Sequence, residues 1–336
     1  MIAVVTGGSG FVGHNLVRRL RQSGYDVHCL VRPGGGEPPR GAARSVVRYD
    51  DPQTLMSCRA LEKADVVFHL AAATRAVRER DFVSANVTPT RVLLGALTAR
   101  RLHPRFVFVS SQAAAGPAAS RSRPIDEVDP PRPVEAYGRS KLEAERIVES
   151  FAERVPVTIV RPAAVLGAHD RDFLRLFRLA QFGTILYPGV ASHWMSWLFV
   201  EDLVDGLLAA SQRHEAISQT YFLAAEAPVQ WRALGEAIAR AMGQRVRHVN
   251  VPGLMVRAAS VGGELFGRLA GHAPLANRSK AALARHPYWV CSASRAASEL
   301  GFRATHSLAD ALRDTYFWYR QSGWLRGSSR APRPAA

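Results

Sequence analysis

The chain has 336 residues, of which 47% are hydrophobic and 21% are charged, so it can bury a large core. Its net charge is +16, but the arginines are spread along the chain without a block of basic and aromatic residues. We therefore expect a solvated basic surface and no nucleic-acid partner. No apolar run reaches the roughly 18 residues of a membrane-spanning helix, so no integral membrane segment is expected. The scattered cysteines indicate neither a disulfide framework nor a metal site: Cys29, Cys58 and Cys291.

The N-terminus predicts a buried strand, a glycine turn and a helix in direct succession. The apolar run begins at Ile2 and leaves no room for a signal peptide, so we expect a cytoplasmic protein. The glycines follow with the spacing Gly7-x-x-Gly10-x-x-Gly13, and an apolar-periodic helix comes next. Glycines let the backbone turn tightly and approach a pyrophosphate, whose charge then lies at the helix N-terminus. The succession therefore predicts that these three glycines bind a dinucleotide.

A second strand, expected over residues 26–31, bears on the choice of cofactor. In NAD-binding sheets an acidic residue at the end of this strand holds the ribose 2′-hydroxyl. Here the strand ends in Val31 and Arg32, so no carboxylate would repel a 2′-phosphate. The Arg32 guanidinium offers several N–H donors to such a phosphate. We therefore expect NADP as the cofactor; the alternative is that Arg32 is one of many surface arginines.

Strands and helices alternate through the first half of the chain. A strand over residues 64–70 ends in Leu70, Ala71 and Ala72, and small residues there let a cofactor lie close to the sheet. His69 lies within this apolar run, and we expect it to be a hydrogen-bonded core residue. The alternation predicts an α/β fold with a doubly wound parallel sheet.

The next two elements bring polar residues to the same sheet edge. A long helix is expected over residues 81–101, with Asn86 near its start. The strand over residues 106–109 then delivers Ser110 and Ser111 to its carboxyl end, where ligands bind in open α/β sheets.

The sequence Tyr137-Gly138-Arg139-Ser140-Lys141 opens another helix and supplies the chemical centre. Tyrosine and lysine four residues apart lie on the same side of a helix, one turn from each other. A tyrosine titrates near pH 10, and a neighbouring ammonium group favours the phenolate. We therefore expect Lys141 to lower the pKa of Tyr137 and make it a general acid and base.

With these motifs in order, the chain resembles the extended short-chain dehydrogenase/reductase family, also called the NAD(P)-dependent epimerase/dehydratase superfamily. The resemblance continues through residues 159–167, 199–203 and 299–302. It implies that Ser111, or else Ser110, holds the substrate oxygen, that Tyr137 transfers the proton, and that Lys141 also binds the nicotinamide ribose. The further cofactor contacts that it implies are Phe11, Val12, Asn86, Tyr137 and Pro162.

Departures from the family pattern narrow the expected substrate. Family dehydratases carry an acidic pair after the catalytic serine or threonine, whereas this chain has Gln112 and Ala113. Members that act on nucleotide sugars usually carry an asparagine and an arginine where this chain has Ala164 and Met195. The sequence around Arg161 instead resembles the branch of dihydroflavonol reductases and 3β-hydroxysteroid dehydrogenases. Where relatives often place an aspartate for the adenine, this chain has Arg48.

The alternation of strands and helices is lost beyond Gly167, which predicts a smaller lobe that binds the substrate. We expect a Rossmann-type NADP-binding domain over residues 1–167, to which residues 196–224 return. A C-terminal α+β substrate lobe is expected from residues 168–195 and 225–325, followed by a disordered tail over 326–336.

Two segments of this lobe could contact an apolar ligand. Trp194 and Met195 either wall a substrate pocket or belong to the core of the lobe. An apolar-rich helix is expected over residues 254–269; it either packs over the pocket or makes peripheral contact with a membrane surface.

Together these features predict an NADP-dependent reductase or dehydrogenase that interconverts a carbonyl and a secondary alcohol on a mainly apolar small molecule. One alternative is a nucleotide-sugar epimerase that uses the same serine, tyrosine and lysine. A second alternative is a non-catalytic NADP-binding regulatory protein. The helices near residues 81–101 and 136–153 resemble the family's dimer-forming pair, so we expect a homodimer.

Overall fold

The computed structural model describes residues 1–188, 192–252, 255 and 285–325. Its centre is a seven-stranded sheet with the order β11-β6-β5-β4-β1-β2-β3, in which all neighbouring strands pair in parallel. The strand order reverses between β1 and β4, which is where a doubly wound sheet binds its ligand. The strands of this sheet are β1 Ile2–Thr6, β2 Asp26–Val31, β3 Ala43–Val46, β4 Val66–His69, β5 Arg105–Val109, β6 Val157–Pro162 and β11 Gln219–Leu223. The predicted fold class is confirmed.

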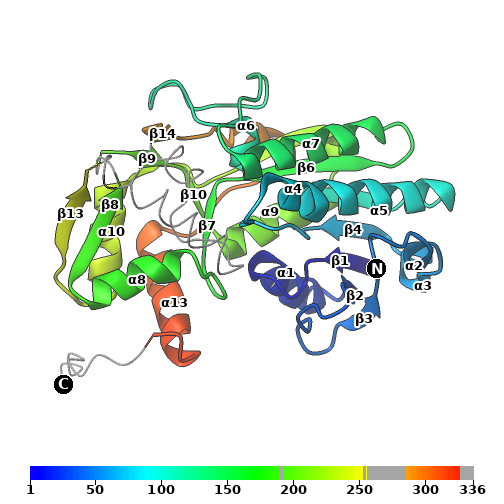
Figure 1. Cartoon of the computed structure of the whole chain (residues 1–336), viewed down its shortest axis with the longest axis horizontal. Helices are drawn as coiled ribbons and strands as arrows, with labels where there is room; N and C mark the ends of the chain where they lie inside the picture. The colour runs from blue at the N-terminus through cyan, green and yellow to red at the C-terminus, as the bar shows by residue number, and fades with distance from the viewer. Residues whose placement is uncertain (189–191, 253–254, 256–284, 326–336) are drawn as a thin grey trace.

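Helices cover both faces of this sheet, as Figure 1 shows. Side chains alternate along β1: Ala3 and Val5 join a cluster with α1, α9 and η3, whereas Val4 joins a cluster with α5 and α7 on the other face. All three side chains are fully buried, so both faces of the sheet are covered as a parallel sheet requires. The helices around the sheet are α1 Phe11–Gln22, α2 Gln53–Met56, α3 Arg59–Glu62, α4 Glu79–Phe82, η1 Val83–Val87, α5 Thr88–Ala99, α6 Gln112–Ala115, α7 Ala136–Ser150, α9 Val200–Gln212, η2 His214–Ala216 and η3 Ala296–Leu300.

The helix expected over residues 81–101 is divided into three parts. The short helix α4 leads into a single π-helical turn, η1, which leads into α5. Pro89 lies near the start of α5 and has no backbone N–H to donate to the preceding turn. The wider turn η1 lies directly before it, and π turns of this kind often occur at functional sites. Asn86 lies in this turn.

A smaller group of elements lies beside the carboxyl edge of the sheet, on the left of Figure 1. Here α8 and α10 pack against a two-stranded pair, β8 and β13, and share an apolar core with α13. The elements outside the main sheet and its helices are β7 Ala164–Leu166, α8 Phe173–Gln181, β8 Thr184–Pro188, β9 Trp194–Met195, β10 Trp197–Phe199, β12 Val229–Gln230, α10 Trp231–Ala241, β13 Arg247–Val251, β14 Tyr288–Trp289 and α13 Leu308–Gln321.

The two lobes are interleaved in sequence. Residues 219–223 form the edge strand β11 of the main sheet, and Ala296, Leu300 and Phe302 pack into the core on the α1 and α9 face. The expected division into domains stays a prediction. The helix expected over residues 254–269 and the tail over 326–336 lie outside the described residues. Within the described ranges, none of the helices combines the length and the apolarity that crossing a bilayer requires.

Candidate active site

The glycine turn between β1 and α1 is packed so closely that side chains would not fit. Gly7 has a φ of +73°, and a Cβ atom there would lie 2.8 Å from the backbone nitrogen of Ala71. A Cβ atom on Gly13 would lie 2.1 Å from the carbonyl oxygen of Gly7. The N–H of Gly10 donates to the same carbonyl at 2.9 Å and closes the turn. The three predicted glycines therefore bring the start of α1 against the end of β4.

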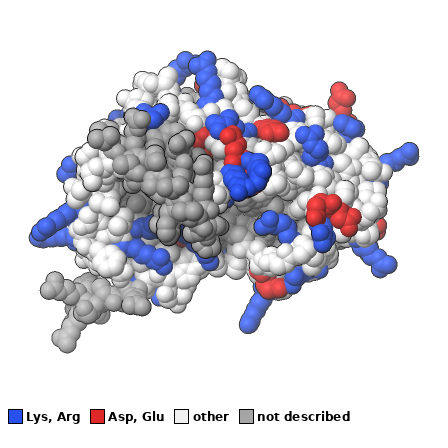
Figure 2. Space-filling view, in the orientation of Figure 1, with Lys and Arg blue, Asp and Glu red and all other residues white. Residues whose placement is uncertain are grey.

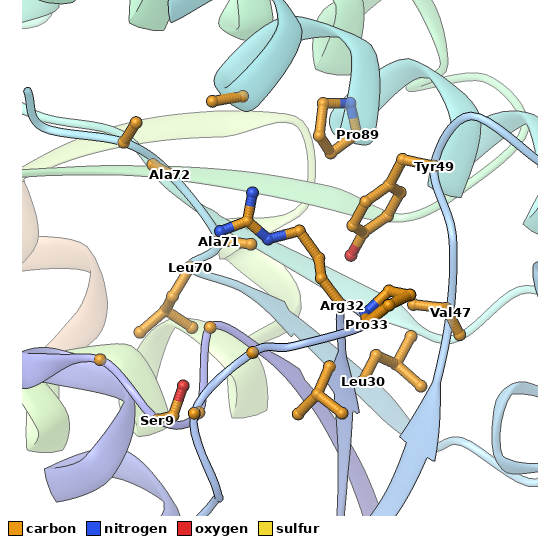
Figure 3. Close-up of a pocket in the computed structure, with 18 of the residues that line it drawn as sticks. Ser9, Leu30, Arg32, Pro33, Val47, Tyr49, Leu70, Ala71, Ala72 and Pro89 are labelled. Atoms are coloured by element: carbon orange, nitrogen blue, oxygen red, sulfur yellow. The ribbon is translucent and has the colours of Figure 1, made fainter. Parts of the chain in front are cut away.

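A cavity of about 640 Å³ opens beside this turn. Its walls come from the ends of β1, β2 and β4 and from the segment after β3 (Figure 3). The predicted cofactor residues that line it are Gly7, Gly10, Arg32, Leu70, Ala71 and Ala72. Further lining residues were not predicted as contacts, among them Ser9, Gly35, Gly36, Val47, Tyr49, Ser84, Ala85 and Pro89. The strand β3, which brings Val47 and Tyr49 here, is short and largely exposed at the sheet edge, so its apolar signal is weak.

Two arginines line this cavity, and only one is paired with a carboxylate. Arg48 binds Asp50 through two N–H groups, at 3.2 and 3.0 Å. Among the residues that the structure describes, no carboxylate forms an ion pair with Arg32, and Figure 3 shows its side chain reaching from the end of β2 into the cavity. Burial raises the pKa of Tyr49, and the nearby Arg32 guanidinium acts in the opposite direction. Arg32 is therefore the arginine of this cavity that has no carboxylate partner within the described part of the chain.

Several predicted cofactor residues lie away from the cavity wall. Phe11 and Val12 pack against the apolar cores, and Pro162 ends strand β6 beside Leu223. Asn86 is buried, and its side-chain amide binds both backbone groups of Ala73, at 2.7 and 3.1 Å.

Asn86 also ties the cavity to α7. Its amide donates to the hydroxyl of Ser140 at 2.9 Å, which joins the loop after β4 to the helix that carries Tyr137 and Lys141. His69 is buried beneath this loop, where its ring nitrogens bind the hydroxyls of Thr6 and Thr90 at 2.7 and 3.0 Å. The prediction that His69 is a hydrogen-bonded core residue is confirmed.

The end of β5 and one face of α7 are joined by three successive contacts. The Lys141 amine donates to the carbonyl oxygen of Val109 at 2.7 Å. The next residue, Ser110, donates its hydroxyl to the Glu145 carboxylate. The Ser111 hydroxyl accepts a hydrogen bond from the N–H of Ala113 at 3.1 Å, and it lies close enough to Tyr137 to act on the pKa of that phenol. Because Ser110 is 4% exposed and its hydroxyl is taken by Glu145, Ser111 is the serine of this pair that faces Tyr137.

Burial controls the protonation of the two predicted catalytic groups of α7. It raises the pKa of Tyr137 to about 12, with the nearby Ser111 hydroxyl acting to lower it and the Glu135 charge acting to raise it. Burial also lowers the pKa of Lys141 to about 7, and the Glu145 charge opposes that change. The expected lowering of the Tyr137 pKa by Lys141 was therefore wrong. The amine is directed to Val109 at the end of β5, and burial dominates at the phenol.

Glu145 and Arg161 form a buried ion pair that sequence reasoning missed. The Arg161 guanidinium binds both carboxylate oxygens of Glu145, at 3.0 and 2.7 Å, and the two side chains are only 6% and 1% exposed. A signal was present: a charged residue lies eight positions after Tyr137 and four after Lys141, among the apolar residues of α7. Its partners could not be inferred, because Ser110 and Arg161 come from two different strands.

Trp194 and Met195 form strand β9 and are half-buried. Met195 packs against the core of the smaller lobe, and the Arg121 guanidinium lies 3.7 Å from the centre of the Trp194 ring. Their role as walls of a substrate pocket stays a prediction.

The residues of the glycine-loop cavity fit a dinucleotide. Three of the lining residues have no side chain and so leave room in the cavity: Gly7, Gly10 and Gly36. At Gly36, for example, a Cβ atom would lie 3.2 Å from the Cβ of Ser9. The unpaired Arg32 supplies positive charge, and α1 begins at the loop. A doubly wound sheet with such a cavity, next to a helix that carries tyrosine and lysine, defines a dinucleotide-dependent enzyme.

Comparison with known proteins agrees with this geometry. Residues 3–224 match the NAD dependent epimerase/dehydratase family. The chain belongs to this family and is an NAD(P)-dependent oxidoreductase of the extended short-chain dehydrogenase/reductase type.

The similar relatives include two bacterial reductases of nearly the same length. The 4-hydroxy-2-methyl-3-oxo-4-farnesyl-3,4-dihydroquinoline-1-oxide ketoreductase of Stigmatella aurantiaca is 30% identical over 330 residues, which is 93% of this chain and 96% of the relative. The ceramide reductase of Caulobacter vibrioides is 28% identical over 96% of both chains. Among solved structures, MoeE5 in complex with UDP-glucuronic acid and NAD has a TM-score of 0.75 at 25% identity, over 96% of this chain and all of that one.

Proposed function

We propose that the protein is an NADP-dependent oxidoreductase that interconverts a carbonyl and a secondary alcohol on a mainly apolar small molecule. The observation that carries this proposal is the position of Ser111 directly after the carboxyl end of β5, close enough to Tyr137 for its hydroxyl to lower the pKa of that phenol. A hydroxyl and a phenol together can bind one carbonyl oxygen. Such a pair supplies the proton and the oxyanion stabilisation that carbonyl reduction requires.

The residues of the chain then have distinct roles. Tyr137 has a raised pKa of about 12, so it is protonated at neutral pH and can donate a proton to the alkoxide that forms during reduction. Ser111 donates a hydrogen bond to the same oxygen and stabilises its developing negative charge. Lys141 places a cationic group one helical turn from Tyr137. A nicotinamide cofactor, when bound, supplies or accepts the hydride.

NADP is proposed over NAD because Arg32 is the cavity's unpaired cation, and because β2 ends without a carboxylate. A guanidinium can bind the extra phosphate of NADP through more than one N–H group. Arg48 is a weaker candidate for this contact, since Asp50 already neutralises it.

The two full-length relatives support a reduction as the reaction, and one of them is named a ketoreductase. One is named for reduction of a farnesylated quinoline oxide and the other for ceramide, and both substrates carry long apolar groups. Ala164 and Met195 replace the two polar residues that nucleotide-sugar enzymes of the family usually use for their substrate. These features favour an apolar ketone over nucleotide-sugar epimerisation.

The test is a screen of apolar ketones with the purified chain, following NADPH consumption by absorbance. Tyr137→Phe should lower kcat roughly 10²- to 10⁴-fold and leave NADPH binding intact. Tyr25→Phe is the matched control, because Tyr25 accepts a hydrogen bond from Gln212 on the far side of the sheet from α7. Turnover that is unchanged in Tyr137→Phe would refute the assignment, whereas NADPH binding without turnover of any carbonyl would favour the regulatory alternative.

We further propose a homodimer formed through α5 and α7. These helices pack against each other on one face of the sheet (Figure 1). Figure 2 shows Lys and Arg side chains dispersed over the visible face, several of them beside acidic residues, without one continuous basic patch. Light scattering that gives twice the chain mass of 36.7 kDa would support the dimer, and a mass of one chain would refute it.

A further inference from the structure

The buried carboxylate of Glu145 lies where α7 meets β5 and β6. It accepts hydrogen bonds from Ser110 at the end of β5 and from Arg161 in β6, so its position is fixed from two strands. Lys141 lies one turn earlier on the same helix and is 1% exposed. Its amine donates to Val109, the residue before Ser110. The carboxylate and the amine come from adjacent turns of one helix and are hydrogen-bonded to two adjacent residues, the last residue of β5 and the one that follows it.

Few charged groups face the Lys141 amine. From β4 comes His69, which burial holds neutral by lowering its pKa to about 3. From β5 comes the Phe108 ring, whose centre lies 4.1 Å from the nitrogen. On α7 itself are Tyr137 and Glu145, and β6 contributes Arg161 behind Glu145. Of these groups, Glu145 is the one whose charge favours the ammonium form.

We propose, resting on the function assigned above, that Glu145 is a positioning residue whose charge favours the protonated form of the Lys141 amine beside Tyr137, with Arg161 and Ser110 holding the carboxylate. Burial alone favours the neutral amine, because the charged form loses its hydration. A fixed carboxylate nearby offsets that loss. Arg161 in turn prevents Glu145 from being a buried, unpaired charge, which is strongly unfavourable in a protein interior.

A purely structural role would have a different consequence. A buried ion pair can be replaced by neutral groups of similar size with little loss of stability, so the fold itself does not require these charges. The protonation of Lys141, by contrast, depends on whether Glu145 carries its charge. This dependence can be measured without substrate or cofactor.

The chain offers a sharp observable, since it contains only three lysines: Lys63, Lys141 and Lys280. In the full-length protein labelled with ¹³C-lysine, the NMR signal of each ε-carbon reports the titration of its own amine. Lys141→Met identifies the Lys141 signal, and the exposed Lys63 is an internal reference. Glu145→Gln should lower the Lys141 titration midpoint by about one pH unit or more, a tenfold loss of proton affinity. Glu143→Gln makes the same chemical change at an exposed position of the same helix and should leave the Lys141 midpoint unchanged. Glu145→Asp keeps the carboxylate, so its Lys141 midpoint should lie nearer to the wild-type value than that of Glu145→Gln.

A folded Glu145→Gln protein with the wild-type midpoint would overturn the proposal. If this variant does not fold because Arg161 is left unpaired, the double variant Glu145→Gln/Arg161→Gln is compared with Arg161→Gln, so that the two proteins differ only in the carboxylate, and the double variant should have the lower midpoint. Equal midpoints in these two proteins would equally overturn the proposal. In turnover, Glu145→Gln should move the basic limb of the pH profile to lower pH. If the NMR midpoint shifts but the wild-type chain reduces no carbonyl, the proposed function fails while the effect of Glu145 on Lys141 stands.

Discussion

The Lys141 amine and the carbonyl oxygen of Val109 are joined by a hydrogen bond of 2.7 Å, which connects α7 to the last residue of β5. Ser110 follows Val109 and donates its hydroxyl to Glu145, one turn further along the same helix, and Ser111 lies close to Tyr137. Val109 and the two serines after it therefore lie along one face of α7, opposite three residues spaced four positions apart. These contacts fix where Tyr137 lies along α7 relative to the carboxyl edge of the sheet, which is the edge that carries the glycine-loop cavity.

Ser111→Ala tests which serine faces the reacting oxygen. If the proposed role is right, loss of this hydroxyl removes one donor to the developing oxyanion, and it also removes a group that lowers the pKa of Tyr137. We expect kcat to fall roughly 10²- to 10³-fold with little change in NADPH affinity. Ser110→Ala is the matched comparison, because the Ser110 hydroxyl is directed to Glu145. The fall in kcat should be smaller in Ser110→Ala than in Ser111→Ala. A larger effect at Ser110 than at Ser111 would reverse the assignment.

Arg32→Ala tests the cofactor preference. If the guanidinium binds the 2′-phosphate, loss of a charge-assisted contact should weaken NADPH binding roughly 10- to 100-fold and leave NADH binding nearly unchanged. Fluorescence titration of both cofactors measures this difference. Arg48→Ala in the same cavity should have a smaller effect, since Asp50 already pairs with that arginine. Wild-type protein that binds NADH as tightly as NADPH would contradict the NADP assignment.

Gly13→Ala tests the close packing of the glycine turn. The added methyl group would lie 2.1 Å from the backbone oxygen of Gly7, which cannot move without opening the turn. We expect a loss of about 1–3 kcal/mol of stability together with weakened cofactor binding. Gly95→Ala in α5 is the control, because no atom lies within 4 Å of its Cβ position. That change should stabilise the helix by about 0.5–1 kcal/mol, as thermal unfolding would show.

The sequence was most informative where one short stretch determined the structure. Strand β2 has the predicted bounds, residues 26–31, because its apolar residues lie between polar ones and are almost all buried. The glycine turn is equally local: its three glycines contact each other and the end of β4. The fold class follows from the alternation of such elements.

What could not be predicted depends on contacts between distant segments. The spacing within α7 places Glu145 on the same face as Tyr137 and Lys141, but its ion pair depends on Arg161 in β6 and on Ser110 after β5, which the helix alone does not identify. The pKa of Tyr137 was predicted with the wrong sign, since helical spacing shows that Lys141 is near but not how deeply the phenol is buried. The turn η1 was missed because the periodicity of residues 81–101 does not register the effect of Pro89 on the preceding turn.

Lys141→Met tests how much burial of the amine destabilises the folded chain. The pH dependence of this effect has a sign that follows from the difference between the pKa of Lys141 in the folded and unfolded chain. The folded-state pKa of Lys141 is about 7, below its ordinary value of about 10.4, so between these values the unfolded chain binds the extra proton. The stability of the wild-type chain should therefore rise with pH across this window, and the burial penalty is fully present below pH 7. Methionine has no such penalty, although it leaves the Val109 carbonyl without its donor. The stability of Lys141→Met relative to wild type should thus be higher at pH 6 than at pH 9, by on the order of 2 kcal/mol.

Denaturant unfolding at the two pH values measures this difference, and Lys63→Met at an exposed position should show none. An equal effect of Lys141→Met at both pH values would mean that the amine keeps its ordinary pKa in the folded chain.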